Sequence, residues 1–139
     1  MEKKILPRSF LQRVMGICAT PKAADAGAWS YSGNKVSVDL DRVPELARPG
    51  TAVRLEGGPL PVKVLLLYGD DGQFRAFKNR CTHFGHRRLD PVPGAKTVQC
   101  CSVNKTTYGY DGKNLFGPGK KPLTQYPLEK KGSKVVILL

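Results

Sequence analysis

Short runs of alternating apolar and polar residues dominate the chain from residue 35 onward. Residues 36–40 alternate strictly, and residues 52–55 and 135–138 are further short runs rich in Val and Leu. Alternation with a period of two places every second side chain on the same face of a sheet. The pattern therefore predicts short β-strands in these three segments.

A hairpin is predicted in the middle of the chain. The apolar run Val62–Tyr68 leads into Gly69-Asp70-Asp71-Gly72, and the chain returns as Phe74–Phe77. Gly and Asp favour the tight turns that join antiparallel strands. Further strands are expected at residues 97–100 and 108–110, and no helical crossover interrupts the series. The expected fold class is all-β, a small antiparallel sandwich or barrel.

The first 26 residues have a different pattern. Residues 9–17 fit a short amphipathic helix, and Thr20-Pro21 ends it. We predict an N-terminal extension over residues 1–26 and one domain over residues 27–139, because a chain of 139 residues can bury one core.

Charged and polar residues interrupt the apolar positions of this extension, namely Arg8, Gln12 and Arg13. The extension therefore predicts neither a transmembrane span nor a secretion signal. Two of the four cysteines, Cys100 and Cys101, are adjacent, which does not fit the disulfide framework of a secreted domain. These features favour a cytoplasmic protein.

The chain is strongly basic. It has 23 Lys and Arg against 11 Asp and Glu, a net charge of +12. Such a surface attracts anions, so we expect either a solvated basic face or an acidic partner protein. The basic residues are scattered and no aromatic-basic stripe accompanies them, so nucleic-acid binding is not predicted.

Candidate chemistry is confined to two segments. Cys81-Thr82-His83 follows one predicted strand, and Cys100-Cys101-Ser102-Val103-Asn104 ends another. Loops on a rigid β scaffold can clamp a metal between them, and thiolate and imidazole are ligands of zinc and of iron–sulfur clusters. No nucleophile with a base, phosphate loop or carboxylate pair is found, so independent catalysis is not predicted.

These segments resemble the two cluster loops of the Rieske [2Fe–2S] family, whose pattern is Cys-x-His followed by Cys-x-x-His-Gly. Residues 79–85 are similar to the first loop, and Gly117-Pro118-Gly119 is similar to the proline loop that covers the cluster. The resemblance runs from about residue 35 to the end of the chain. It implies a ferredoxin-like one-electron carrier that holds a [2Fe–2S] cluster and serves a redox partner protein, which the charge suggests is acidic.

The resemblance implies that Cys81 and Cys101 hold the inner iron and His83 the outer one. The second histidine of the family falls on Asn104, whose neutral amide is a poor iron ligand. Four completions stay open. Cys100 supplies a third thiolate, His86 supplies a second imidazole, Asn104 or water completes a labile cluster, or the site is empty.

Each substitute ligand could instead have a structural role and bind no metal. Cys100 is then a small buried residue of its strand, because neighbours in an extended segment face opposite sides. His86 is then a surface imidazole beside two arginines. Thr106 and Tyr108 lie where hydroxyl groups tune the cluster potential in the family, although Tyr108 also fits a core position.

Two other functions stay open. One is a cluster-free Rieske fold that acts as an interaction or accessory module. The other is a mononuclear zinc site, for which four residues have suitable side chains: Cys81, His83, His86 and Cys101.

Overall fold

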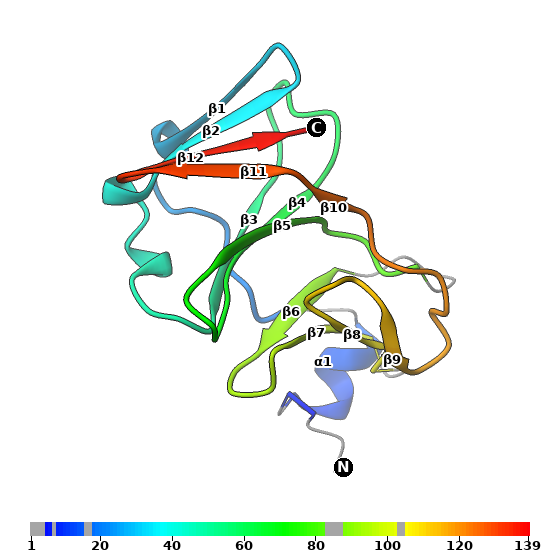
Figure 1. The fold of residues 1–139 in the computed structure, drawn as a ribbon. Coiled ribbons are helices and arrows are strands. Elements are labelled where there is room, and N and C mark those ends of the chain that lie inside the picture. Colours follow the sequence, from blue (N-terminus) through cyan, green and yellow to red (C-terminus); the bar gives the residue numbers. More distant parts are fainter. Residues whose placement is uncertain (1–4, 7, 16–17, 83–87, 103–104) are drawn as a thin grey trace.

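The computed structural model describes residues 5–6, 8–15, 18–82, 88–102 and 105–139. Antiparallel strands dominate it, and they form three four-stranded sheets in which all strand pairs are antiparallel (Figure 1). The fold class predicted from the sequence pattern is confirmed.

The first sheet has the order β1-β2-β12-β11, the second β10-β5-β4-β3, and the third β6-β7-β8-β9. The strands of the first sheet are β1 (Trp29–Ser32), β2 (Lys35–Asp39), β11 (Leu128–Lys131) and β12 (Lys134–Leu138). Those of the second are β3 (Thr51–Leu55), β4 (Val64–Tyr68), β5 (Phe74–Lys78) and β10 (Gln125–Tyr126). Those of the third are β6 (Leu89–Val92), β7 (Thr97–Cys100), β8 (Thr107–Gly109) and β9 (Asn114–Phe116).

The helical elements are short. They are α1 (Phe10–Val14) and three 3₁₀ turns, η1 (Ala26–Ala28), η2 (Leu40–Arg42) and η3 (Pro44–Leu46). None of the helices in the described ranges is long and apolar enough to cross a membrane.

The second sheet lies between two hydrophobic cores, and each of its faces packs against one of them. Along β4, Val64 and Leu66 pack into a core with the first sheet, whereas Leu65 and Leu67 pack into a core with the third sheet. All four side chains are fully buried. This burial explains the continuous apolar run in the sequence, because a strand that is covered on both faces has no position that faces solvent.

The predicted strands are confirmed with shifts of one or two residues at their ends, and the hairpin joins β4 to β5. Pattern reasoning missed β6, in part because it contains Pro91. This strand is at the edge of its sheet, where the missing N–H of proline is tolerated. Pattern reasoning also missed β1, whose side chains are at most half-buried.

The N-terminal segment packs onto the third sheet. Ser9 caps α1 in a reciprocal capping box with Gln12, which agrees with the predicted helix start. Further on, Thr20 donates its backbone N–H and its hydroxyl to the buried Asp90 of β6, at 2.9 and 2.7 Å. The segment is thus joined to the domain, and the boundary at residue 26 stays a prediction.

Candidate metal centre

The two candidate loops start from neighbouring sheets. Cys81 follows β5 of the second sheet, and Cys100 is the last residue of β7 in the third sheet. Asn79 links the two ends of the first loop: its side-chain oxygen accepts a hydrogen bond from the Leu89 N–H at 2.8 Å. This bond joins the start and the end of the first loop at residues 79 and 89.

The thiols of Cys81 and Cys100 share one buried cluster with Tyr108. All three residues are fully buried. The Tyr108 hydroxyl lies 3.4 Å from the Cys81 sulfur, and Cys100 donates to the Ser102 hydroxyl at 3.2 Å. A hydrogen bond with Cys81, followed by burial, strongly raises the pKa of the Cys100 thiol. The structure therefore brings Cys81 and Cys100 together.

Cys101 has different neighbours. Its backbone N–H donates to the Arg88 carbonyl at 3.0 Å, and its thiol lies outside the cluster of Cys81 and Cys100. Burial, followed by the negative charges of Asp90 and Cys18, raises the pKa of the Cys101 thiol to about 11. Adjacent residues of an extended segment face opposite sides, which explains the separation of Cys100 from Cys101.

The remaining predicted ligands, His83, His86 and Asn104, lie outside the described residues. Within the part of the chain that is described, no group of three His, Cys, Asp or Glu side chains is placed to hold a metal ion. The described structure thus shows the thiol side of the candidate centre, and the imidazole ligands stay predictions.

The Gly117–Gly119 segment lies against both loops. Gly119 N–H donates to the Thr106 hydroxyl at 3.3 Å, and the Thr82 hydroxyl donates to the Lys121 carbonyl at 2.8 Å. A Cβ on Gly119 would lie 2.5 Å from the Tyr108 hydroxyl oxygen. This segment can lie so close to Tyr108 and Thr82 because it has no side chain at that position.

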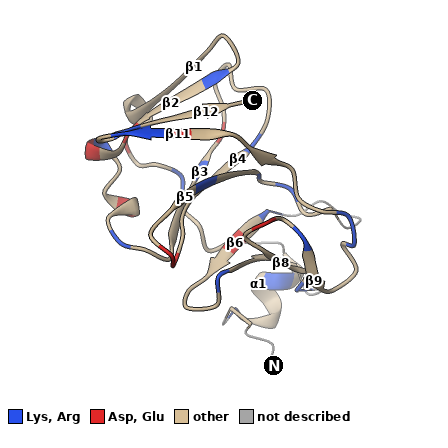
Figure 2. Cartoon of the chain, in the orientation of Figure 1, with Lys and Arg blue, Asp and Glu red and all other residues tan. Residues whose placement is uncertain are grey.

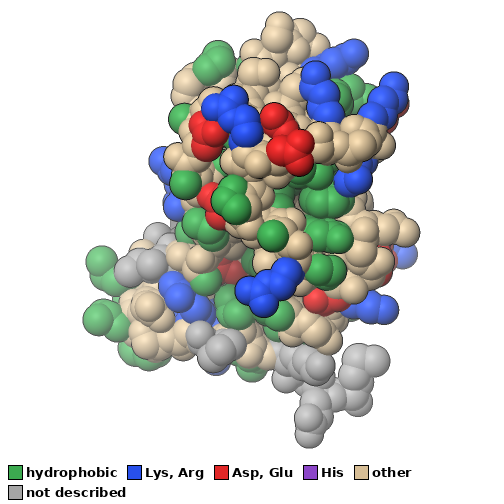
Figure 3. Space-filling view, turned by 90° about the vertical axis from the view of Figure 1, so that its left-hand side faces the viewer, with side chains coloured by type: hydrophobic (Ala, Val, Ile, Leu, Met, Phe, Trp, Pro, Cys, Tyr) green, Lys and Arg blue, Asp and Glu red, His purple; other side chains and the backbone are tan. Residues whose placement is uncertain are grey.

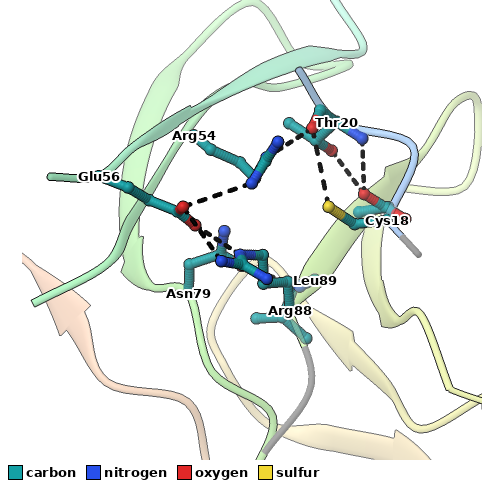
Figure 4. Close-up of polar contacts among 8 residues, drawn as sticks. Cys18, Thr20, Arg54, Glu56, Asn79, Arg88 and Leu89 are labelled. Carbon is teal, nitrogen blue, oxygen red and sulfur yellow. Dashed lines mark hydrogen bonds and ion pairs between the residues drawn. The ribbon is translucent and has the colours of Figure 1, made fainter. Parts of the chain in front are cut away.

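A polar network behind the first loop was missed by sequence reasoning (Figure 4). Glu56 is nearly buried and pairs with Arg54 at 3.3 Å and with Arg88. Arg54 donates to the Thr20 carbonyl at 2.8 Å, which ties the N-terminal segment to the same network. Arg54 and Glu56 are neighbours in the sequence, but Thr20 and Arg88 lie 34 and 32 positions from their partners. The four residues share no motif, so no local signal predicts the network.

Comparison with known proteins decides the family. The profile of the Rieske [2Fe-2S] domain matches residues 37–127 of the chain, which include both candidate loops and Gly117–Gly119. The chain belongs to the Rieske [2Fe–2S] domain family. Membership of this family implies a [2Fe–2S] cluster, and Cys81, Cys100 and Cys101 all lie within the matched region.

Curated relatives of this chain include an oxygenase subunit and a ferredoxin subunit. The glycine betaine monooxygenase oxygenase subunit of Pseudomonas aeruginosa is 30% identical over 92 residues, which are 66% of this chain and 21% of that protein. The chain thus spans about a fifth of the length of this oxygenase subunit. The 3-phenylpropionate/cinnamic acid dioxygenase ferredoxin subunit of Shigella boydii is 31% identical over 90 residues, 63% of this chain and 80% of that protein.

Solved Rieske structures share the fold. The ferredoxin of carbazole 1,9a-dioxygenase from Nocardioides aromaticivorans superposes with a TM-score of 0.57 at 16% identity, covering 73% of this chain and 92% of that chain. A quaternary ammonium Rieske monooxygenase superposes with a TM-score of 0.53 at 19% identity, covering 68% of this chain and 30% of that chain. At this identity the likeness shows the fold alone.

The described residues fit the thiolate half of such a cluster. Two thiols lie together in a buried site, and the Tyr108 hydroxyl lies within hydrogen-bonding distance of the Cys81 sulfur and of the Thr82 hydroxyl. Iron binds thiolate, so metal loading must release the thiol protons. When bound, the cluster accepts and releases one electron.

Replacing Tyr108 with Phe is expected to lower the reduction potential of the cluster. A hydrogen bond to a ligand sulfur stabilises the reduced, more negative state. A differential loss of about 1 kcal/mol corresponds to a drop on the order of 40 mV for one electron. Spectroelectrochemical titration measures the change.

Tyr110→Phe is the matched control, because the Tyr110 hydroxyl bonds with Asp70 in the hairpin region and not with a cysteine. Equal shifts in the two variants would contradict a specific effect of the bond to Cys81.

Proposed function

We propose that this protein is a ferredoxin-like one-electron carrier of an oxygenase or related oxidoreductase system. The observation that carries the proposal is the buried group of Cys81, Cys100 and Tyr108, which lies beside the Gly117–Gly119 segment in a Rieske domain. A ferredoxin subunit of which this chain covers 80% supports the carrier over a catalytic subunit. Among the described residues of the matched region 37–127, the elements are short strands, two 3₁₀ turns and connecting loops, an arrangement that fits a small carrier domain.

The proposed ligand set uses Cys81 and Cys100 as the thiolate pair and His83 on the other iron. The contact between the Cys81 and Cys100 thiols supports this pair, whereas the family spacing selects Cys101. The remaining coordination position is left to Cys101, His86 or Asn104. A third thiolate would add one negative charge and lower the reduction potential relative to a centre with two imidazoles.

A cytoplasmic location is part of the proposal. All four cysteines are free thiols, with Cys81, Cys100 and Cys101 buried and Cys18 half-buried. Free thiols together with an iron–sulfur cluster fit a reducing compartment.

Iron analysis of protein prepared without oxygen tests the function. The expected result is about two irons per chain together with the visible absorbance of a [2Fe–2S] cluster that is bleached on reduction. Colourless protein that takes up no iron on anaerobic reconstitution would favour the cluster-free interaction module. Stoichiometric zinc in place of iron would favour the mononuclear site.

The redox partner is proposed to be acidic and to dock beside Cys81. A hollow of about 310 Å³ is lined there by Cys81, Thr82, Thr124 and three cations, Lys78, Arg80 and Lys121. In the described part of the chain, the ion pairs are formed by other arginines, and of these three cations Arg80 and Lys121 are exposed and Lys78 is half-buried. Elsewhere Lys and Arg are spread over the molecule at separate places (Figures 2 and 3). Carboxylates of a partner would complement the hollow next to the electron-transfer centre.

Reversing two charges of the hollow is expected to slow electron transfer to an anion. In the double variant Lys78→Glu, Lys121→Glu, oxidation of the reduced protein by ferricyanide should slow by about tenfold at low ionic strength, and added salt should shrink the difference. Stopped-flow absorbance follows the reaction.

Lys35→Glu, Lys134→Glu is the control, because it makes the same change in net charge on the first sheet. The cationic oxidant hexaammineruthenium should respond in the opposite direction to ferricyanide. Equal slowing by both double variants would show that only net charge matters, and would refute a docking site beside Cys81.

A further inference from the structure

Helix α1 buries a charge and exposes its apolar residues. Arg13 is 4% exposed and is the buried residue of the helix, whereas Phe10 and Leu11 are 78% and 70% exposed. An amphipathic surface helix ordinarily packs its apolar side against the core. In this chain the helix instead contacts the domain through the guanidinium group of Arg13. Burial of apolar area therefore does not explain why the helix packs there.

The Arg13 guanidinium lies against the second candidate loop. It donates to the carbonyl oxygens of Cys100 at 3.4 Å and Ser102 at 3.1 Å, which flank Cys101 on both sides. It also donates to the Gln99 side chain at 2.9 Å and to the Leu6 carbonyl at 2.7 Å. Gln99 is buried as well and is oriented by its own donation to the Thr107 hydroxyl at 2.9 Å. The arginine therefore has a fixed position.

Among the described residues, the four acceptors of Arg13 are neutral oxygens. The ion pairs in the described residues join Asp25, Glu56 and Asp71 to other arginines. Burial lowers the pKa of Arg13, and Cys101 opposes this more than the buried Asp90 does. Arginine keeps its proton under such conditions, so the site holds a buried positive charge beside the thiols. A buried cation is costly unless an anion is near it.

We propose that Arg13 is a built-in counter-charge for the cluster, which places a fixed cation behind the cysteine loop and raises the reduction potential. Each thiolate ligand adds negative charge to the centre, and reduction adds one more. A fixed cation stabilises the reduced state more than the oxidised state, because its interaction scales with the charge of the centre. The N-terminal segment then belongs to the redox site. This inference rests on the proposed function, since it requires a cluster.

Arg13→Met and Arg13→Lys separate charge from structure. Both variants lose the forked hydrogen bonds, but only Arg13→Met loses the charge. At a fixed applied potential, Arg13→Met should shift the ratio of reduced to oxidised cluster by roughly tenfold toward the oxidised form, equivalent to 59 mV for one electron. Arg13→Lys should stay close to the wild type. Arg42→Met is the control for a remote arginine that is paired with Asp25 on the surface.

Each possible result either supports or overturns the role of Arg13 as a counter-charge. Equal potentials in Arg13→Met and wild type, or equal shifts in the Met and Lys variants, would overturn it. If Arg13→Met does not retain the cluster, iron retention replaces the potential as the readout: retention by Arg13→Lys supports the counter-charge, and equal loss from both variants overturns it. Absence of a cluster from the wild-type protein would instead defeat the proposed function, so the two failures are distinguishable.

Discussion

Cys100→Ser is expected to abolish cluster binding, whereas Cys101→Ser retains most of the iron. Cys100 shares a buried cluster with Cys81 and forms a hydrogen bond with it, whereas Cys101 lies outside that cluster. Serine keeps the size of cysteine and removes the soft thiolate that iron requires. Iron content per chain and visible absorbance after anaerobic preparation measure the outcome.

The two adjacent cysteines are controls for each other, because both are buried and both substitutions remove one sulfur. Cys18→Ser adds a third control outside the two loops. Retention of iron by Cys100→Ser with loss from Cys101→Ser would show that the family spacing selects the ligand and that the thiol contact in the structure does not. Loss of iron from both variants would show a centre with three thiolates.

Gly117→Ala is expected to destabilise the protein by about 3 kcal/mol and to shorten the lifetime of the cluster. A Cβ at this position would lie 2.5 Å from the Thr106 Cα, which is backbone and cannot rotate away. The φ of +95° adds strain of about 1–2 kcal/mol for any residue with a side chain. To relieve the clash, the segment must move away from the second loop. Urea unfolding and the rate of bleaching in air give the two readouts.

Gly57→Ala separates strain from steric clash. Gly57 has a φ of +96°, and nothing lies within 4 Å of a Cβ built on it. This control should therefore lose only the 1–2 kcal/mol due to strain. If the two variants lost the same stability and kept the same cluster lifetime, close packing of Gly117 against Thr106 would have no role in protecting the site.

Much of the fold was predictable because the controlling interactions are local. The alternation in residues 36–40 specifies a strand with one buried face, and Gly-Asp-Asp-Gly specifies the turn between β4 and β5. The capping box of Ser9 and Gln12 likewise needs only residues that are close in the sequence. Edge strands were harder to predict, since β6 contains a proline and the side chains of β1 are at most half-buried.

By itself, the sequence determined the fold class and the Rieske resemblance, and it predicted that Asn104 falls on the second histidine of the family, because all three depend on residue types and their spacing. The tertiary structure decided which of the two adjacent cysteines lies against Cys81, and it brought together the three cations that line the hollow beside Cys81. It also placed Arg13 on Ser102, a residue 89 positions away. Such contacts form only when whole sheets and the N-terminal segment pack together, and no local pattern in the sequence encodes them.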